Sequence, residues 1–173
     1  MGSSKLSEWL QTAAAAGVII GLALVAYELR MSNRIAWEVA SVDSLEKWDR
    51  VSEALRSPNT AKLFLSAHSG EILSREEVLK LNAFTDVAMS TILHDYRLIQ
   101  TGTLNMPQGF ESAYNGVIQF YLGNQYGQRR WAVVKFAWEP DFVTAVDKAL
   151  AASNQRNIIG ELDFVRGEVD QVN

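Results

Sequence analysis

A long uncharged block near the N-terminus is the feature that most constrains this chain. The nineteen residues from Trp9 to Tyr27, WLQTAAAAGVIIGLALVAY, include no Asp, Glu, Lys or Arg. As a helix they would extend about 28 Å, close to the ~30 Å hydrocarbon core of a bilayer. Trp9 and Tyr27 stand at the two ends, where such rings favour the headgroup level. The block therefore predicts a single membrane-spanning helix.

Two other interpretations of the block stay open. A cleaved signal peptide has a basic start, a shorter apolar stretch and a small-residue cleavage site, for which residues 21–23 (GLA) are a candidate. Against cleavage, only Lys5 is basic before the block, Glu8 offsets it, and apolar residues continue past the candidate site. The Ala-rich residues 13–16 also suit a buried helix of a soluble protein.

The basic residues on either side predict how the helix crosses the membrane. Lys5 and the amino terminus precede the block, whereas Arg30, Arg34 and Lys47 follow it. Because basic residues collect on the cytoplasmic side, the C-terminal portion is expected in the cytoplasm. Arg30 and Arg34 are also close enough to the bilayer in sequence to contact anionic headgroups.

Small residues recur at intervals of four within the block. Gly17 and Gly21 form a GxxxG pair, and Ala13 extends the stripe by one step. Such a stripe lets two helix backbones approach closely. The hypothesis is a helix–helix contact in a homo-oligomer or with another membrane subunit. The alternative is that Gly and Ala are simply common in spanning helices.

Most of the remaining chain carries helical patterns. Residues 28–56 lack Pro and Gly, and their apolar residues recur at steps of three or four, as on one face of an amphipathic helix: Met31, Ile35, Val39, Val42, Leu45, Trp48, Val51 and Leu55. Any break from the spanning helix is expected at Ser32-Asn33. Further helices are expected over residues 59–66, from a capping box at Ser74–Glu77 to a stop at Gly102, from Pro107 to Gly123, and over 128–138 and 141–152.

These signals predict an all-α chain with an N-terminal transmembrane helix and a small helical-bundle domain of about five helices. The expected divisions are a short N-terminal segment (1–8), the transmembrane helix (9–27), a juxtamembrane amphipathic helix (28–56), the helical domain (57–153) and an acidic, weakly ordered tail (154–173). The tail is interrupted by Gly and shows only weak strand-like alternation.

Signatures of catalysis are missing from the sequence. Cysteine is absent, and the two histidines, His68 and His94, stand in unrelated contexts, although a metal site needs three or four converging ligands. His94-Asp95 is therefore interpreted as structural, and Glu76-Glu77 as part of a helix cap. No phosphate-binding Gly loop, GxSxG, HExxH or dinucleotide fingerprint occurs. The expectation is a non-enzyme without catalytic residues, cofactor or metal.

Charge and aromatic content indicate the expected partners. Sixteen basic against twenty acidic residues give a net charge of −4, so nucleic acid is not an expected partner. Membrane lipid is an expected partner. Aromatic residues gather between positions 110 and 142, where core packing explains most of them. A ligand or partner surface is the alternative, with these candidates: Tyr114, Arg129, Arg130, Trp131 and Trp138.

The order of elements also carries a resemblance. After the apolar block, the amphipathic helix and a helix that ends at a glycine comes the segment GQRRWAVVKFAWEPDFVTAVDKAL. The residues that carry the resemblance are Gly102, Trp131, Pro140, Phe142, Val146 and Asp147. In this arrangement the chain resembles uncharacterised small bacterial single-pass membrane-anchored helical proteins. The resemblance implies a helical domain on a membrane tether and brings no known activity. The expected location is the bacterial inner membrane, with a single pass. The predicted function is an interaction or accessory protein; the alternative is a tethered sensor or small-ligand or lipid-binding domain that uses residues 110–142.

Overall fold

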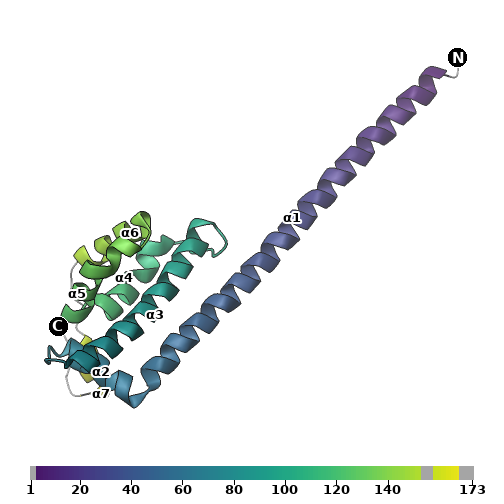
Figure 1. Cartoon of the computed structure of the whole chain (residues 1–173). Helices are drawn as coiled ribbons and strands as arrows, with labels where there is room; N and C mark the ends of the chain where they lie inside the picture. Colours follow the sequence, from purple (N-terminus) through teal and green to yellow (C-terminus); the bar gives the residue numbers. More distant parts are fainter. Residues whose placement is uncertain (1–2, 153–157, 168–173) are drawn as a thin grey trace. The chain divides into compact units, whose positions relative to one another are not determined.

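The computed structural model describes residues 3–152 and 158–167 of the chain. All regular structure in these residues is helical, with seven α-helices and one short 3₁₀ helix (Figure 1). The predicted all-α fold class is confirmed at this level. The chain divides into two compact units, Met1–Ser41 and Val42–Asn173.

The first unit is the N-terminal part of helix α1 (Ser3–Arg56). The helix continues through Ser32 and Asn33, because these residues lower helix propensity by only tenths of a kcal/mol. Between Trp9 and Tyr27 the large apolar side chains are 52–76% exposed. This stretch is long and apolar enough to cross a membrane.

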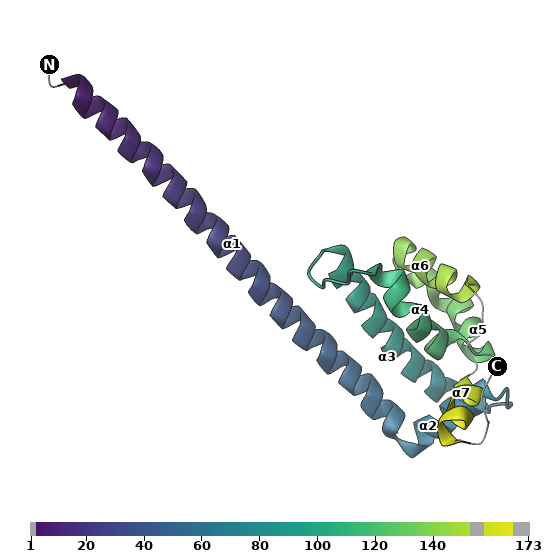
Figure 2. The same ribbon diagram turned by 180° about the vertical axis from the view of Figure 1, so that it is seen from behind.

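The second unit starts at Val42 within α1 and contains the remaining helices. These are α2 (Pro58–His68), α3 (Arg75–Gln100), α4 (Gly109–Leu122), α5 (Gln125–Val134), the 3₁₀ helix η1 (Lys135–Ala137), α6 (Pro140–Ala151) and α7 (Ile158–Arg166). Helices α2 to α6 correspond to the five helices expected from the sequence. Helix α4 contacts both α3 and α6, and it lies between them in Figures 1 and 2.

Local signals in the sequence define several helix ends. Pro58 occupies the first turn of α2, where its missing N–H costs nothing. The predicted capping box of α3 is present: the Glu77 N–H donates to Ser74 Oγ (3.3 Å), and the Ser74 N–H donates to Glu77 Oε2 (2.8 Å). Gly102 follows α3 with φ of +70°, a left-handed conformation that favours glycine.

The core of the second unit is aromatic and aliphatic. Its most deeply buried side chains, under 2% exposed, include Phe142, Ile92, Ile118, Leu122, Val51 and Val146. Phe142 shows how the rings interlock, with centroids 5.4 Å from Tyr96 and 5.7 Å from Trp138. Burying rings of this size lets short helices remove enough apolar surface from water to be stable.

Part of α1 presents a different face from the one expected. Val51 is fully buried, whereas Val42 and Leu45 are 56% and 65% exposed. Val42 and Val51 are nine residues apart, and nine steps of about 100° put them on opposite sides of a helix. The predicted single apolar face of residues 28–56 is therefore wrong, because repeated steps of three residues carry the apolar positions around the helix and not along one side.

Two further segments differ from expectation. The helix predicted over residues 128–138 begins earlier, at Gln125, because Asn124 Oδ1 caps it by accepting the N–H groups of Tyr126 (3.0 Å) and Gly127 (2.9 Å). The predicted weakly ordered tail contains α7, whose Ile158 is 4% exposed in the core. The rest of that tail, 154–157 and 168–173, lies outside the described residues.

Candidate functional site

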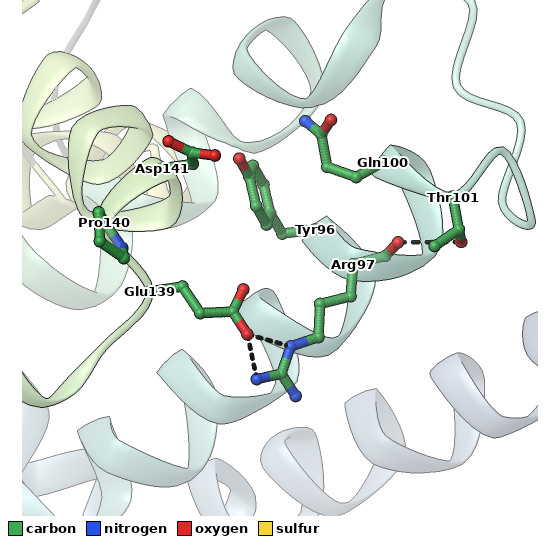
Figure 3. A pocket seen from close by; sticks show the side chains of 7 residues that line it. All are labelled: Tyr96, Arg97, Gln100, Thr101, Glu139, Pro140 and Asp141. Carbon is green, nitrogen blue, oxygen red and sulfur yellow. Dashed lines mark hydrogen bonds and ion pairs between the residues drawn. The ribbon is translucent and has the colours of Figure 1, made fainter.

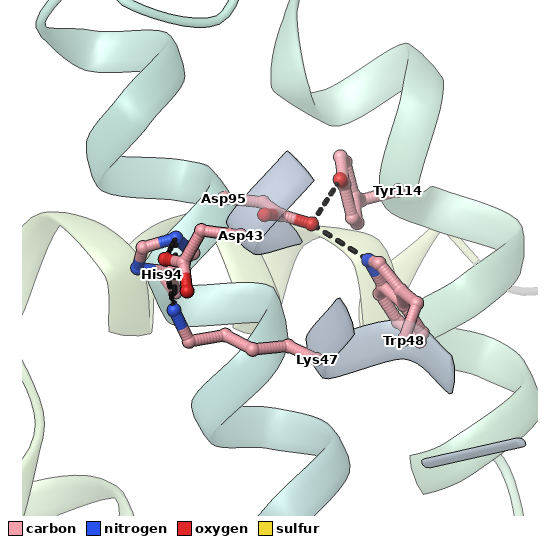
Figure 4. Close-up of polar contacts among 6 residues, drawn as sticks. All are labelled: Asp43, Lys47, Trp48, His94, Asp95 and Tyr114. Carbon is pink, nitrogen blue, oxygen red and sulfur yellow. Dashed lines mark hydrogen bonds and ion pairs between the residues drawn. The ribbon is translucent and has the colours of Figure 1, made fainter. Parts of the chain in front are cut away.

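A buried carboxyl group joins three helices of the second unit. Asp95 of α3 is 0% exposed. Its Oδ2 accepts hydrogen bonds from Trp48 Nε1 of α1 (2.7 Å) and from the Tyr114 hydroxyl of α4 (2.6 Å), as Figure 4 shows. Within the described residues, Oδ1 has no hydrogen-bond partner. This group therefore holds the end of α1 against the domain.

The surroundings keep Tyr114 a hydrogen-bond donor. Burial, and then its hydrogen bond to Asp95, raise the pKa of the Tyr114 hydroxyl far above its ordinary value. The hydroxyl is therefore protonated throughout the physiological range. The Trp48 ring also packs against Tyr114 (6.5 Å between centroids) and Tyr121 (6.3 Å). Polar and aromatic contacts thus fix Trp48 together.

A second polar cluster also joins α1 and α3 (Figure 4). His94 Nε2 lies 2.9 Å from Asp43 Oδ2 and 3.2 Å from Lys47 Nζ. Lys47 also pairs with Asp43, and this hydrogen bond lowers the pKa of the Asp43 carboxyl. One ring nitrogen of His94 thus faces both charged groups, so the His94 side chain serves the junction between the helices.

A cavity beside this cluster is lined by residues of α1 and α3. Its volume is about 310 Å³, and its lining consists of Lys47, Arg50, Asp86, Val87, Ser90 and Thr91. His94 and Asp95 are not among these residues. The described part of the chain also contains no group of three His, Cys, Asp or Glu side chains placed to hold a metal ion.

A larger depression of about 480 Å³ lies between the end of α3 and the start of α6. Figure 3 shows its lining: Tyr96, Arg97, Gln100, Thr101, Glu139, Pro140 and Asp141. Arg97 Nε donates to Glu139 Oε1 (2.8 Å) at its edge. Burial, and then the carboxylates Asp141 and Glu139, raise the pKa of Tyr96. The depression therefore offers a protonated phenol, an amide and carboxylates to a polar ligand.

The predicted aromatic candidates lie mostly in the interior. Tyr114 and Trp131 are 6% and 3% exposed. Trp131 Nε1 donates to Asp147 Oδ1 (2.7 Å), and Trp138 is half-buried with its ring 6.2 Å from that of Trp131. Burial opposes ionisation of Asp147, but hydrogen bonds from Lys135 and Trp131 outweigh it and lower the pKa.

The two neighbouring arginines differ in their surroundings. Arg130 Nη2 donates to Asp86 Oδ2 of α3 at 2.7 Å, and this bond raises the pKa of the guanidinium. Arg129 is exposed on the outer side of α5. The structure therefore gives Arg130 a role in joining α5 to α3 and leaves Arg129 directed to solvent.

The predicted membrane residues all lie on the exposed surface of α1. A Cβ added at Gly17 or Gly21 would meet nothing within 4 Å, so packing within one chain does not require glycine there. Ala13, Trp9 and Tyr27 are exposed too. The same is true of the interface candidates Arg30 and Arg34, and Arg34 Nε donates to Glu38 Oε1 (3.0 Å).

The sequence interpretation did not single out Asp95 as a buried residue. A signal was available, because Asp95 continues the apolar stripe of α3 through Ala88, Ile92 and Ile99 at steps of three or four. An acidic residue inside such a stripe is expected to find donors when the stripe is buried. Those donors, Trp48 and Tyr114, lie on other helices.

These features define a class: an all-helical chain with one long, exposed apolar helix and a compact helical domain. Comparisons with models of protein families, with curated proteins and with solved structures find no match for this chain. The resemblance to bacterial membrane-anchored helical proteins therefore stays a prediction.

Proposed function

We propose that this protein is a single-pass membrane-anchored helical protein that acts as a non-enzymatic interaction or accessory module, with its C-terminal domain in the cytoplasm. One observation carries the proposal: the apolar stretch of α1 that is long enough to span a bilayer has 0% of its residues buried. An uncovered apolar surface of this length is costly in water and favourable in lipid. Arg30 and Arg34 after the stretch support the cytoplasmic orientation.

The polar groups of the domain support a role in binding rather than in catalysis. Asp95 and His94 are the side chains whose chemistry most suggests catalysis, and both are engaged between helices. Their contacts support a structural role in which residues 42–56 of α1 are joined to α3 and α4 within the second unit.

Membrane fractionation of the full chain tests the anchor. The expected result is a protein that stays with the membrane after carbonate extraction and floats with it in a density gradient. Release into the soluble fraction would contradict membrane spanning. Single-cysteine labelling from either side of sealed vesicles, possible because the chain has no cysteine, tests the orientation.

Self-association through the small-residue stripe is part of the proposal. The open space at Gly17 and Gly21 supports it, because a second helix is free to approach there. Replacing both by Leu should reduce energy transfer between labelled copies in vesicles. The matched control is Ala15→Leu with Ala26→Leu, since both alanines lie about half a turn away from the stripe. Equal energy transfer in the two variants would remove the stripe from the interface.

The depression between α3 and α6 favours a second candidate, a tethered sensor of a small polar ligand. Its ~480 Å³ is in the usual range for ligand pockets, and Tyr96 with Asp141 offers an uncharged donor and a negative charge. A thermal-shift screen with small amines, amino acids and lipids tests this function, since a bound ligand raises the melting temperature by mass action. A Tyr96→Phe variant should reduce any rise in melting temperature. An unchanged melting temperature across the whole panel would contradict the sensor function.

A further inference from the structure

The outer face of α5 and η1 is apolar although it is exposed. On the inner side of this segment Gly127 and Trp131 are buried. On the outer side Val133 is 73% exposed and Phe136 is 85% exposed. Arg129 lies four residues before Val133, and Phe136 lies three residues after it, so the three side chains are on one side of the segment. A large aromatic ring with this exposure is costly in water.

The segment is also basic within an acidic chain. Residues 125–137, QYGQRRWAVVKFA, contain three basic and no acidic residues, whereas the whole chain has a net charge of −4. Arg130 pairs with Asp86 and Lys135 pairs with Asp147. Within the residues that the structure describes, Arg129 takes part in no ion pair, and its exposed charge is directed to solvent beside the apolar side chains.

Contacts within the second unit locate this face near the point where α1 enters the unit. Asp43, next to the first residue of the unit, contacts His94 of α3. One turn further along α3, Arg97 bonds to Glu139, which follows Phe136 by three residues. The η1 end of the face therefore lies at the same end of the domain as the entry of α1. If residues 9–27 span the bilayer, only the fourteen residues 28–41 separate them in sequence from the second unit.

We propose that the outer face of α5 and η1 binds the surface of an anionic bilayer, with Val133 and Phe136 entering the boundary between headgroups and acyl chains and Arg129 contacting lipid phosphate. Exposed apolar rings beside unpaired basic residues are typical of surfaces that bind this way. The inference deepens the proposed function and rests on it, since an anchor in the bilayer tethers the second unit to a membrane.

The absence of cysteine allows single-site labelling of the full chain. A Val133→Cys variant carries a polarity-sensitive fluorophore, and a Leu79→Cys variant, at a residue of α3 that is 69% exposed, is the control. Both are reconstituted into vesicles of phosphatidylcholine alone or mixed with phosphatidylglycerol. At position 133 we expect a blue shift and quenching by headgroup nitroxide in the anionic vesicles, both reduced by high salt. At position 79 the label should stay in water.

Two further substitutions separate the contributions of charge and of apolar surface to membrane binding. Arg129→Gln should reduce the ratio of inserted to free label about fivefold in anionic vesicles and leave neutral vesicles unchanged, since one basic residue near an anionic surface contributes about that factor. Phe136→Ser should reduce insertion in both lipid mixtures.

Three results would overturn the inference: equal spectra at positions 133 and 79, insensitivity to phosphatidylglycerol, or the same blue shift in detergent without a bilayer, which would mean that a second copy covers the face. Carbonate-resistant flotation of the same samples keeps the two proposals apart. Loss of flotation contradicts the anchor, whereas intact flotation with an unshifted label at position 133 contradicts the lipid contact.

Discussion

Replacing Tyr114 by Phe removes a single hydroxyl from the interior of the domain. That hydroxyl donates a 2.6 Å hydrogen bond to Asp95, which is 0% exposed, so water cannot replace the lost donor without entering the core. Asp95 Oδ2 keeps its bond from Trp48, and the aromatic ring keeps its packing. A hydrogen bond to a buried carboxyl group contributes about 1.5–3 kcal/mol, so we expect Tyr114→Phe to lower the free energy of unfolding by that amount.

Tyr121 offers a matched control on the same helix. Its side chain is 7% exposed against 6% for Tyr114, and no hydrogen bond of its hydroxyl is found within the described residues. Tyr121→Phe should therefore change the free energy of unfolding by less than about 0.5 kcal/mol.

Urea unfolding of the full chain in one detergent, followed by near-UV circular dichroism, measures both variants. A loss of 1.5–3 kcal/mol lowers the urea midpoint by about 1 M at the usual slope for a small domain. Asp95→Ala should lower the midpoint further than Tyr114→Phe, because it removes the acceptor of both Trp48 and Tyr114. Equal midpoints for Tyr114→Phe and Tyr121→Phe would refute the role assigned to Asp95.

Four further variants test the packing of the domain and the pH dependence of its stability. Phe142→Ala should cost about 3–5 kcal/mol because Phe142 is 0% exposed, whereas Phe136→Ala, at a residue that is 85% exposed, should stay within about 0.5 kcal/mol; a similar loss in both would contradict the assigned burial. Gly127→Ala should cost about 1–3 kcal/mol, since its Cβ would lie 2.7 Å from Leu122 Cα, and an unchanged melting temperature would count against this close approach. Burial lowers the pKa of His68 from its ordinary 6.5, so the unfolded chain binds a proton more readily and the free energy of unfolding should fall as the pH drops below 6.5. His68→Gln should flatten this dependence between neutral and mildly acidic pH; a dependence as steep as that of the parent chain would assign it to another group.

The local rules of helices made much of the fold predictable. The Ser74–Glu77 capping box and the Gly102 stop depend on contacts within a few residues, and both are present in the structure. The start of α5 at Gln125 was missed although its cause is also local, because an Asn cap followed by a Gly looks like a loop in sequence.

The candidate site was much less predictable. Arg129 was a candidate surface residue from its sequence, and it is exposed. Trp131 and Tyr114 had the same candidate status, but both lie in the core, bonded to Asp147 and Asp95. A pattern of aromatic residues indicates that large apolar area is available, but it does not say which ring faces inward.

Sequence alone determined the helical class of the chain, the length and apolar character of Trp9–Tyr27, and the ends of helices that local capping defines. These properties depend on backbone hydrogen bonds and on residues within one or two turns of each other. Tertiary structure decided which side of α1 meets the domain, with Val51 inward and Val42 outward, and which donors satisfy Asp95. The physical reason is that the contacts within a helix stay the same whichever of its sides is turned toward the neighbouring helices. Only the neighbouring helices, brought close by burial of apolar surface, select one rotation and supply the partners of a buried polar group.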